Sequence, residues 1–173
     1  MAMLSFDIRE LESAAIVVDG DLRPDDGVWQ TGDAVPSGPI RASGRLSAAG
    51  ADRFYWHGHI AGSAVLPCRR CLTETSVHVE DDAHIIFAAL GAEDADDPDV
   101  YRFDPRAREL DLRPAVRELW LLNAPAFALC REDCKGLCPT CGADLNAGPC
   151  GCPTTRDSRW DALRKLGSPA VES

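Results

Sequence analysis

From Cys130 to Gly142 the sequence reads Cys-Arg-Glu-Asp-Cys-Lys-Gly-Leu-Cys-Pro-Thr-Cys-Gly, and a further pair, Cys150 and Cys152, follows closely. Two more cysteines, Cys68 and Cys71, lie far upstream, so all eight cysteines of the chain fall into four close pairs. Two tetrathiolate sites need four such pairs, because one short turn supplies two of the four tetrahedral ligands of Zn²⁺. The sequence therefore predicts two structural zinc ions per chain.

The spacing of the pairs favours one grouping over another. Eight residues separate Cys141 from Cys150, enough for one small turn to close a site, whereas 58 residues separate Cys71 from Cys130. The preferred grouping makes every cysteine a metal ligand. It forms a first site from Cys68, Cys71, Cys130 and Cys134, and a second from Cys138, Cys141, Cys150 and Cys152. A competing arrangement takes one site from the six C-terminal cysteines and leaves the upstream pair half-liganded.

Other cysteine chemistries fit the pattern less well. Disulfides are disfavoured in a reducing compartment, and a C-x-C pair seldom reaches disulfide geometry. A redox C-x-x-C motif needs a strand-to-helix context, whereas Cys68 lies between two predicted strands. An iron–sulfur cluster uses the same ligands and stays open as an alternative, although the knuckle shape around Cys138-Pro139-Thr140-Cys141 favours zinc.

Alternating apolar residues and turn signals predict a β-rich body. We expect strands at about 3–9, 40–48, 53–66 and 73–90, a short apolar run at 14–18, and a turn-rich surface connection over 22–39. Helical spacing predicts a main helix over 111–123, with Asp111 as its N-cap and Pro125 ending it. The fold class is α+β: a curved antiparallel, partly barrel-like sheet with one main helix, a cysteine-rich zinc module and a short terminal helix at about 158–166. The expected boundary separates residues 1–129 from the zinc-binding tail, 130–173.

Charge limits the choice of partner. The formal net charge is −10, and residues 1–129 carry all of it, because residues 130–173 contain six basic and six acidic side chains. A chain this acidic can bind a nucleic acid by counterion release only if its basic residues are gathered on one surface. The longest apolar runs are far shorter than the roughly 20 residues of a membrane helix. The start lacks the order of a signal peptide, so a cytoplasmic protein without membrane contact is expected.

Two histidines stand out in the strand predicted over 53–66. His57 and His59 are two residues apart, so they share one face of that strand, and Trp56 points to the other face. With no cysteine or carboxylate beside them in the sequence, we interpret them as strand residues rather than metal ligands.

The order of these motifs resembles one known family. A strand-borne C-x-x-C is followed by Glu109-Leu110-Asp111-Leu112 opening a helix, then by the run from Cys130 to Asn146, Cys150-Gly151-Cys152 and a short basic helix. This arrangement is similar to the YceD family, the large ribosomal RNA subunit accumulation proteins. The resemblance implies a role in synthesis, processing or stability of the large-subunit ribosomal RNA, without an established catalytic activity.

The leading hypothesis is a non-enzymatic ribosome-biogenesis factor that binds ribosomal RNA or a ribosomal protein, with no small-molecule substrate. The rival is an acidic module that binds a basic ribosomal protein and affects RNA indirectly, a better electrostatic match. A metal-dependent hydrolase is disfavoured, because a tetrathiolate zinc has no open position for water. If RNA is bound directly, the expected contacts are basic residues near the knuckles and on the last helix: Arg69, Arg70, Lys135, Arg156, Arg159, Arg164 and Lys165.

Overall fold

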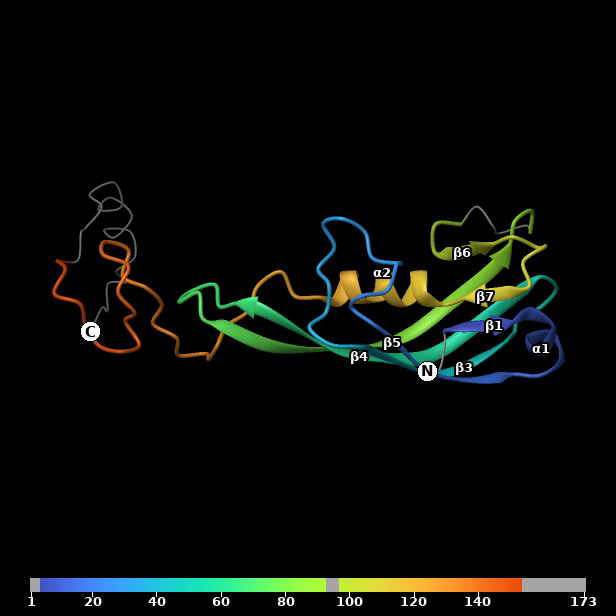
Figure 1. Cartoon of the computed structure of the whole chain (residues 1–173), viewed down its shortest axis with the longest axis horizontal. Helices are drawn as coiled ribbons and strands as arrows, with labels where there is room; N and C mark the ends of the chain where they lie inside the picture. The colour runs from blue at the N-terminus through green and yellow to red at the C-terminus, as the bar shows by residue number, and fades with distance from the viewer. Residues whose placement is uncertain (1–3, 93–96, 154–173) are drawn as a thin grey trace, which may run out of the picture.

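The computed structural model describes residues 4–92 and 97–153, which form a long twisted sheet covered on one face (Figure 1). The elements in chain order are β1 (Ser5–Asp7), α1 (Ile8–Ser13), β2 (Ile16–Leu22), β3 (Ile40–Ala48), β4 (Arg53–Pro67), β5 (Glu74–Ala89), β6 (Val100–Phe103), β7 (Glu109–Asp111) and α2 (Arg113–Asn123). In this part of the chain no helix is long and apolar enough to cross a membrane. The terminal helix expected at 158–166 lies outside the described residues.

The fold is α+β, as the sequence predicts, but the main sheet is not wholly antiparallel. Its strand order is β2-β3-β4-β5-β6, and the first three pairings are antiparallel, as the sequence predicts. The pairing of β5 with β6 is parallel, which corrects that prediction. The chain after Ala89 is long enough to cross back, and Tyr101 and Phe103 then pack their rings 5.6 Å from those of Phe87 and Phe54. The sheet stays open, with β2 and β6 at its edges, rather than partly barrel-like.

The N-terminal strand is shorter than its apolar alternation predicts. β1 ends at Asp7, whose carboxylate accepts the backbone N–H of Arg9 and so caps α1. β1 pairs antiparallel with β7 in a separate two-stranded sheet, and neither α1 nor β7 was expected from the sequence. The capping chemistry of Asp7 therefore ends the strand at the point where the alternation alone would continue it.

The main helix forms where the sequence predicts it, with a different cap. Leu112 occupies the N-cap position without a side-chain bond, and Asp111, the predicted cap, accepts the backbone N–H of Arg113 at 2.9 Å. The helix ends at Asn123, two residues before Pro125. α2 lies against one face of β4 and β5, so its apolar side closes the core.

The core holds two fully buried tryptophans, Trp56 on β4 and Trp120 on α2. Gly62 makes room for Trp120, because a Cβ there would lie 2.8 Å from Cζ3 of its ring. The turn-rich connection over 22–39 is fixed onto α2: the Trp120 indole N–H donates to the carbonyl of Ala34 at 2.6 Å. The Arg117 guanidinium also pairs with the carboxylate of Asp33, with both bonds at 2.7 Å.

Candidate metal centres

The first cysteine tetrad joins the tip of the β4–β5 hairpin to the segment after α2. Cys68 and Cys71 lie in the turn between these strands, and the backbone N–H of Arg69 donates to the carbonyl of Ala128. Figure 1 shows the chain after α2 running along the hairpin to its tip and continuing beyond it. This path brings Cys130 and Cys134 to the hairpin tip.

The sulfur atoms of this tetrad have the spacing of a mononuclear site. All four ligand atoms lie within 4.8 Å of one another. The distance is 3.9 Å from Cys68 Sγ to Cys134 Sγ and 3.6 Å from Cys71 Sγ to Cys130 Sγ. Tetrahedral Zn–S bonds of about 2.3 Å place their sulfurs about 3.8 Å apart. These thiols are free, and their sulfurs are too far apart for disulfides.

Backbone geometry fixes this first tetrad. The N–H of Leu72 donates to the carbonyl of Cys68, and Leu72 adopts a left-handed φ of 63°. Opposite it, Gly136 has a φ of 75°, and a Cβ there would lie 2.8 Å from the carbonyl oxygen of Arg70. Only glycine combines this conformation with so close an approach.

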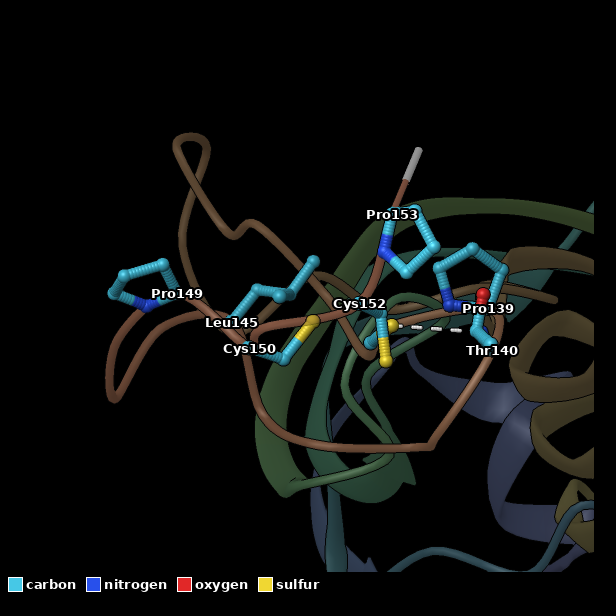
Figure 2. A pocket seen from close by; sticks show the side chains of 8 residues that line it. Pro139, Thr140, Leu145, Pro149, Cys150, Cys152 and Pro153 are labelled. Atoms are coloured by element: carbon cyan, nitrogen blue, oxygen red, sulfur yellow. Dashed lines mark hydrogen bonds between the residues drawn. The ribbon is translucent and has the colours of Figure 1, made fainter. Parts of the chain in front are cut away.

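The second tetrad lies within one short segment. The sulfurs of its four cysteines also lie within 4.8 Å of one another, so the structure gathers the eight cysteines in the preferred grouping: Cys138, Cys141, Cys150 and Cys152 here, the other four in the first tetrad. The Gly142 N–H donates to the Cys138 carbonyl, and the Thr140 N–H lies 3.4 Å from Cys138 Sγ (Figure 2). Leu145 and three prolines line an apolar hollow beside these sulfurs.

Asn146 links the two tetrads, although it belongs to the loop that closes the second one. Its side-chain amide donates to Cys134 Sγ at 3.5 Å and to the carboxylate of Asp144 at 2.7 Å. Its oxygen accepts the Lys135 backbone N–H and the Arg131 guanidinium, both at 2.8 Å. The cysteine spacing alone gave no signal for this residue. Asn146 therefore ties the loop that closes the second tetrad to a ligand of the first.

The thiols of each tetrad are electrostatically unequal. Backbone N–H groups of Cys130 and Arg70 lower the pKa of Cys68 to about 6, and those of Cys141 and Thr140 do the same for Cys138. Burial, then the neighbouring Cys134 thiol, raises the pKa of Cys130. A hydrogen bond with the Thr73 hydroxyl also lowers the pKa of Cys71, whereas the neighbouring Cys141 thiol, then burial, raises the pKa of Cys152. The close approach of like charges opposes ionisation of several thiols in one tetrad. A bound cation offsets that repulsion.

Comparison with known proteins agrees with this arrangement. Residues 56–167, which include most of β4, all of β5 and β6, the main helix and both tetrads, match the family described as Large ribosomal RNA subunit accumulation protein YceD. The chain belongs to the YceD family.

Individual relatives match parts of this chain. A chloroplastic YceD homologue of Zea mays is 35% identical over 95 residues, which are 47% of this chain and 32% of the maize protein. One from Arabidopsis thaliana is 39% identical over 54 residues, 31% and 17% of the two chains. An uncharacterised protein of Mycobacterium tuberculosis is 30% identical over 119 residues, 67% and 56%. The chain thus spans at most about half of these relatives' lengths, and no solved structure matches it.

The basic residues that the sequence predicts as RNA contacts differ in their surroundings. The Arg70 guanidinium donates to the carbonyls of Glu132 and Cys134, at 3.2 and 2.8 Å, and so fastens the segment after α2. Arg69 and Lys135 are exposed beside the first tetrad. The remaining four lie outside the described residues: Arg156, Arg159, Arg164 and Lys165.

Proposed function

We propose that this chain is a non-enzymatic ribosome-biogenesis factor that supports synthesis, processing or stability of the large-subunit ribosomal RNA. The observation that carries the proposal is the match to the YceD family over residues 56–167, from β4 through α2 to both tetrads. The family description names a ribosomal RNA accumulation factor and no enzyme class. We extend that role to this chain, acting in the cytoplasm, with residues 1–129 as the folded body and 130–173 as its metal-binding tail.

We assign structural zinc to both tetrads. Four thiolates form a closed ligand set, which leaves no position for a reactive water. The 3.6 and 3.9 Å sulfur separations in the first tetrad support a single ion with four bonds. The zinc would hold the hairpin tip to the segment after α2 and close the loop that follows.

We expect two zinc ions per chain when the protein is purified under reducing conditions. Elemental analysis measures the ratio, and titration with a thiol reagent counts the cysteines that remain reactive. The Cys71→Ser variant, which loses one ligand of the first tetrad, should retain about one zinc. A wild-type ratio of one or less with reactive thiols remaining, or iron in place of zinc, would contradict the assignment.

Depletion of the protein from its source cell should lower the ratio of large-subunit to small-subunit ribosomal RNA. Restoring the wild-type chain should restore the ratio, because the deficit follows from loss of this protein alone. Quantitative electrophoresis of total RNA measures both species in one sample. An unchanged ratio, or an equal loss of both RNAs, would contradict a role specific to the large subunit.

A second candidate function rests on charge. The net charge of −10 matches a basic ribosomal protein better than it matches RNA, so RNA effects could follow from protein binding. Affinity capture from extract at low and at high salt, with both RNA and protein analysed, distinguishes the two candidates by the component that stays bound. If one basic protein is captured, and is still captured in the same amount after nuclease has removed the RNA, the second candidate is favoured.

A further inference from the structure

The face of the sheet opposite α2 carries a set of flat side chains. Along β4, Phe54 and Trp56 point into the core, whereas Tyr55, His57 and His59 alternate with them on the outer face. α2 lies on one side of the β4–β5 ribbon (Figure 1). The outer face presents exposed and half-exposed side chains over the paired part of β2 to β5.

Three of these side chains form a stack of rings. The His57 and His84 rings have their centroids 4.8 Å apart and are inclined by 20°. The Tyr55 ring lies 6.4 Å from both and is inclined by 10° to His57 and 25° to His84. The Tyr55 hydroxyl and Nδ1 of His84 are 2.8 Å apart, which fixes the stack. The rings are therefore nearly parallel, and both imidazoles are exposed.

A cation and two apolar side chains border the rings. Register pairs Arg45 with His57 on one side and with Val17 on the other, and it pairs Tyr55 with Ile86. Val17 is 76% exposed. We call this set the ring patch: Val17, Arg45, Tyr55, His57, His84 and Ile86.

The ring patch contains no carboxylate, which is unusual in a chain of net charge −10. The nearest acidic side chains on this face already have partners: Asp19 pairs with Arg41, and Asp82 lies 3.0 Å from Nδ1 of His59. Arg45, in contrast, has no ion-pair or hydrogen-bond partner for its side chain among residues 4–92 and 97–153. A local positive charge beside flat rings is the combination that binds single-stranded nucleic acid, with the cation on a phosphate and bases stacked on the rings.

We propose that the ring patch binds a single-stranded segment of RNA, with a base extending the ring stack and Arg45 contacting the adjacent phosphate. The inference rests on the proposed role in large-subunit ribosomal RNA and names the surface that would contact it. It differs from the expectation that the basic residues around the cysteines make the contacts. A duplex buries its base faces within its own stack, so the ring patch discriminates against double-stranded RNA.

The test uses the full chain and a fluorescein-labelled mixed-sequence RNA of about 12 nucleotides, single-stranded or annealed to its complement. Fluorescence anisotropy at several salt concentrations gives affinity and salt slope. Wild-type protein should prefer the single strand. Arg45→Gln should reduce the slope by about 0.7, the value for one single-strand phosphate contact. His57→Ala should weaken binding by about fivefold or more without changing the slope, because it removes a stacking ring.

Matched controls separate the ring patch from general charge and from folding. Arg9→Gln removes an exposed arginine on α1, and His78→Ala removes an exposed imidazole farther along the outer face; both should bind RNA as the wild type does. Thermal unfolding should be unchanged in all four variants. If the wild-type protein binds RNA and the Arg45→Gln and His57→Ala variants bind it equally well, the ring patch is not the RNA-binding surface.

Two further results would also overturn the ring patch. One is a wild type that binds neither form of RNA, and the other is a change of sedimentation in these variants, which would make the patch a contact between copies of this chain. The ratio of ribosomal RNAs after depletion tests the proposed function separately, so a failure of the patch does not count against that function.

Discussion

Replacing Cys71 by serine should destabilise the whole molecule. Its thiol belongs to the tetrad that ties the β4–β5 hairpin tip to the segment following α2, and 58 residues lie between it and Cys130 along the chain. Metal binding and folding are coupled in such sites, so loss of one ligand costs several kcal/mol of folding free energy. We expect a clear fall in the midpoint of thermal unfolding, measured by circular dichroism on zinc-loaded protein.

Cys138→Ser is the matched comparison, because it removes one thiolate from the tetrad that closes a short loop. Loop-closure entropy alone makes the 58-residue closure about 1.7 kcal/mol more stabilising than the eight-residue one. The main transition should therefore persist in Cys138→Ser near its wild-type midpoint, with loosening confined to the tail. The contacts of Asn146 with Cys134 and Lys135 transmit a small part of the loss to the first tetrad. Equal loss of the main transition in both variants would contradict this division.

The cysteine grouping could be predicted because it follows from local chemistry. Each C-x-x-C turn supplies two adjacent ligands, and the distance between pairs along the chain indicates which pairs combine. The boundaries of β3, β4 and β5 were likewise predicted to within about one residue, because their alternation runs over many positions. Long periodic strands and paired cysteines are thus the features that a single sequence specifies best.

Other features depend on contacts that no local pattern encodes. The parallel pairing of β6 depends on Tyr101 and Phe103 packing against rings on β4 and β5. Asn146 reaches the first tetrad only because the second folds back beside it. The two histidines on β4 were correctly predicted to share a face, but the ring stack needs His84 from the neighbouring strand. Each of these contacts joins segments whose register is known only in the folded chain.

Trp120→Ala should cause the largest loss of stability among the core changes. The side chain is fully buried between α2 and β4, and it packs against the space left by Gly62. Truncation of a buried tryptophan to alanine costs about 3–5 kcal/mol, since it removes apolar contacts and leaves a cavity. For a chain of this size that corresponds to a fall of roughly 10 °C in the unfolding midpoint. Differential scanning calorimetry of the zinc-loaded protein measures it.

The same substitution should release the connection over 22–39, because the indole N–H no longer holds the Ala34 carbonyl. Trp120→Phe helps to separate the two effects: it keeps a six-membered aromatic ring in the core but removes the N–H donor and part of the indole, so it should cost clearly less than Trp120→Ala. Leu122→Ala is the control on the same helix, because that side chain is 74% exposed and its loss should leave the midpoint almost unchanged. Hydrogen exchange of the 22–39 amides should rise in both Trp120 variants and not in Leu122→Ala. Similar midpoints for Trp120→Ala and Leu122→Ala would mean that α2 does not close the core through this tryptophan.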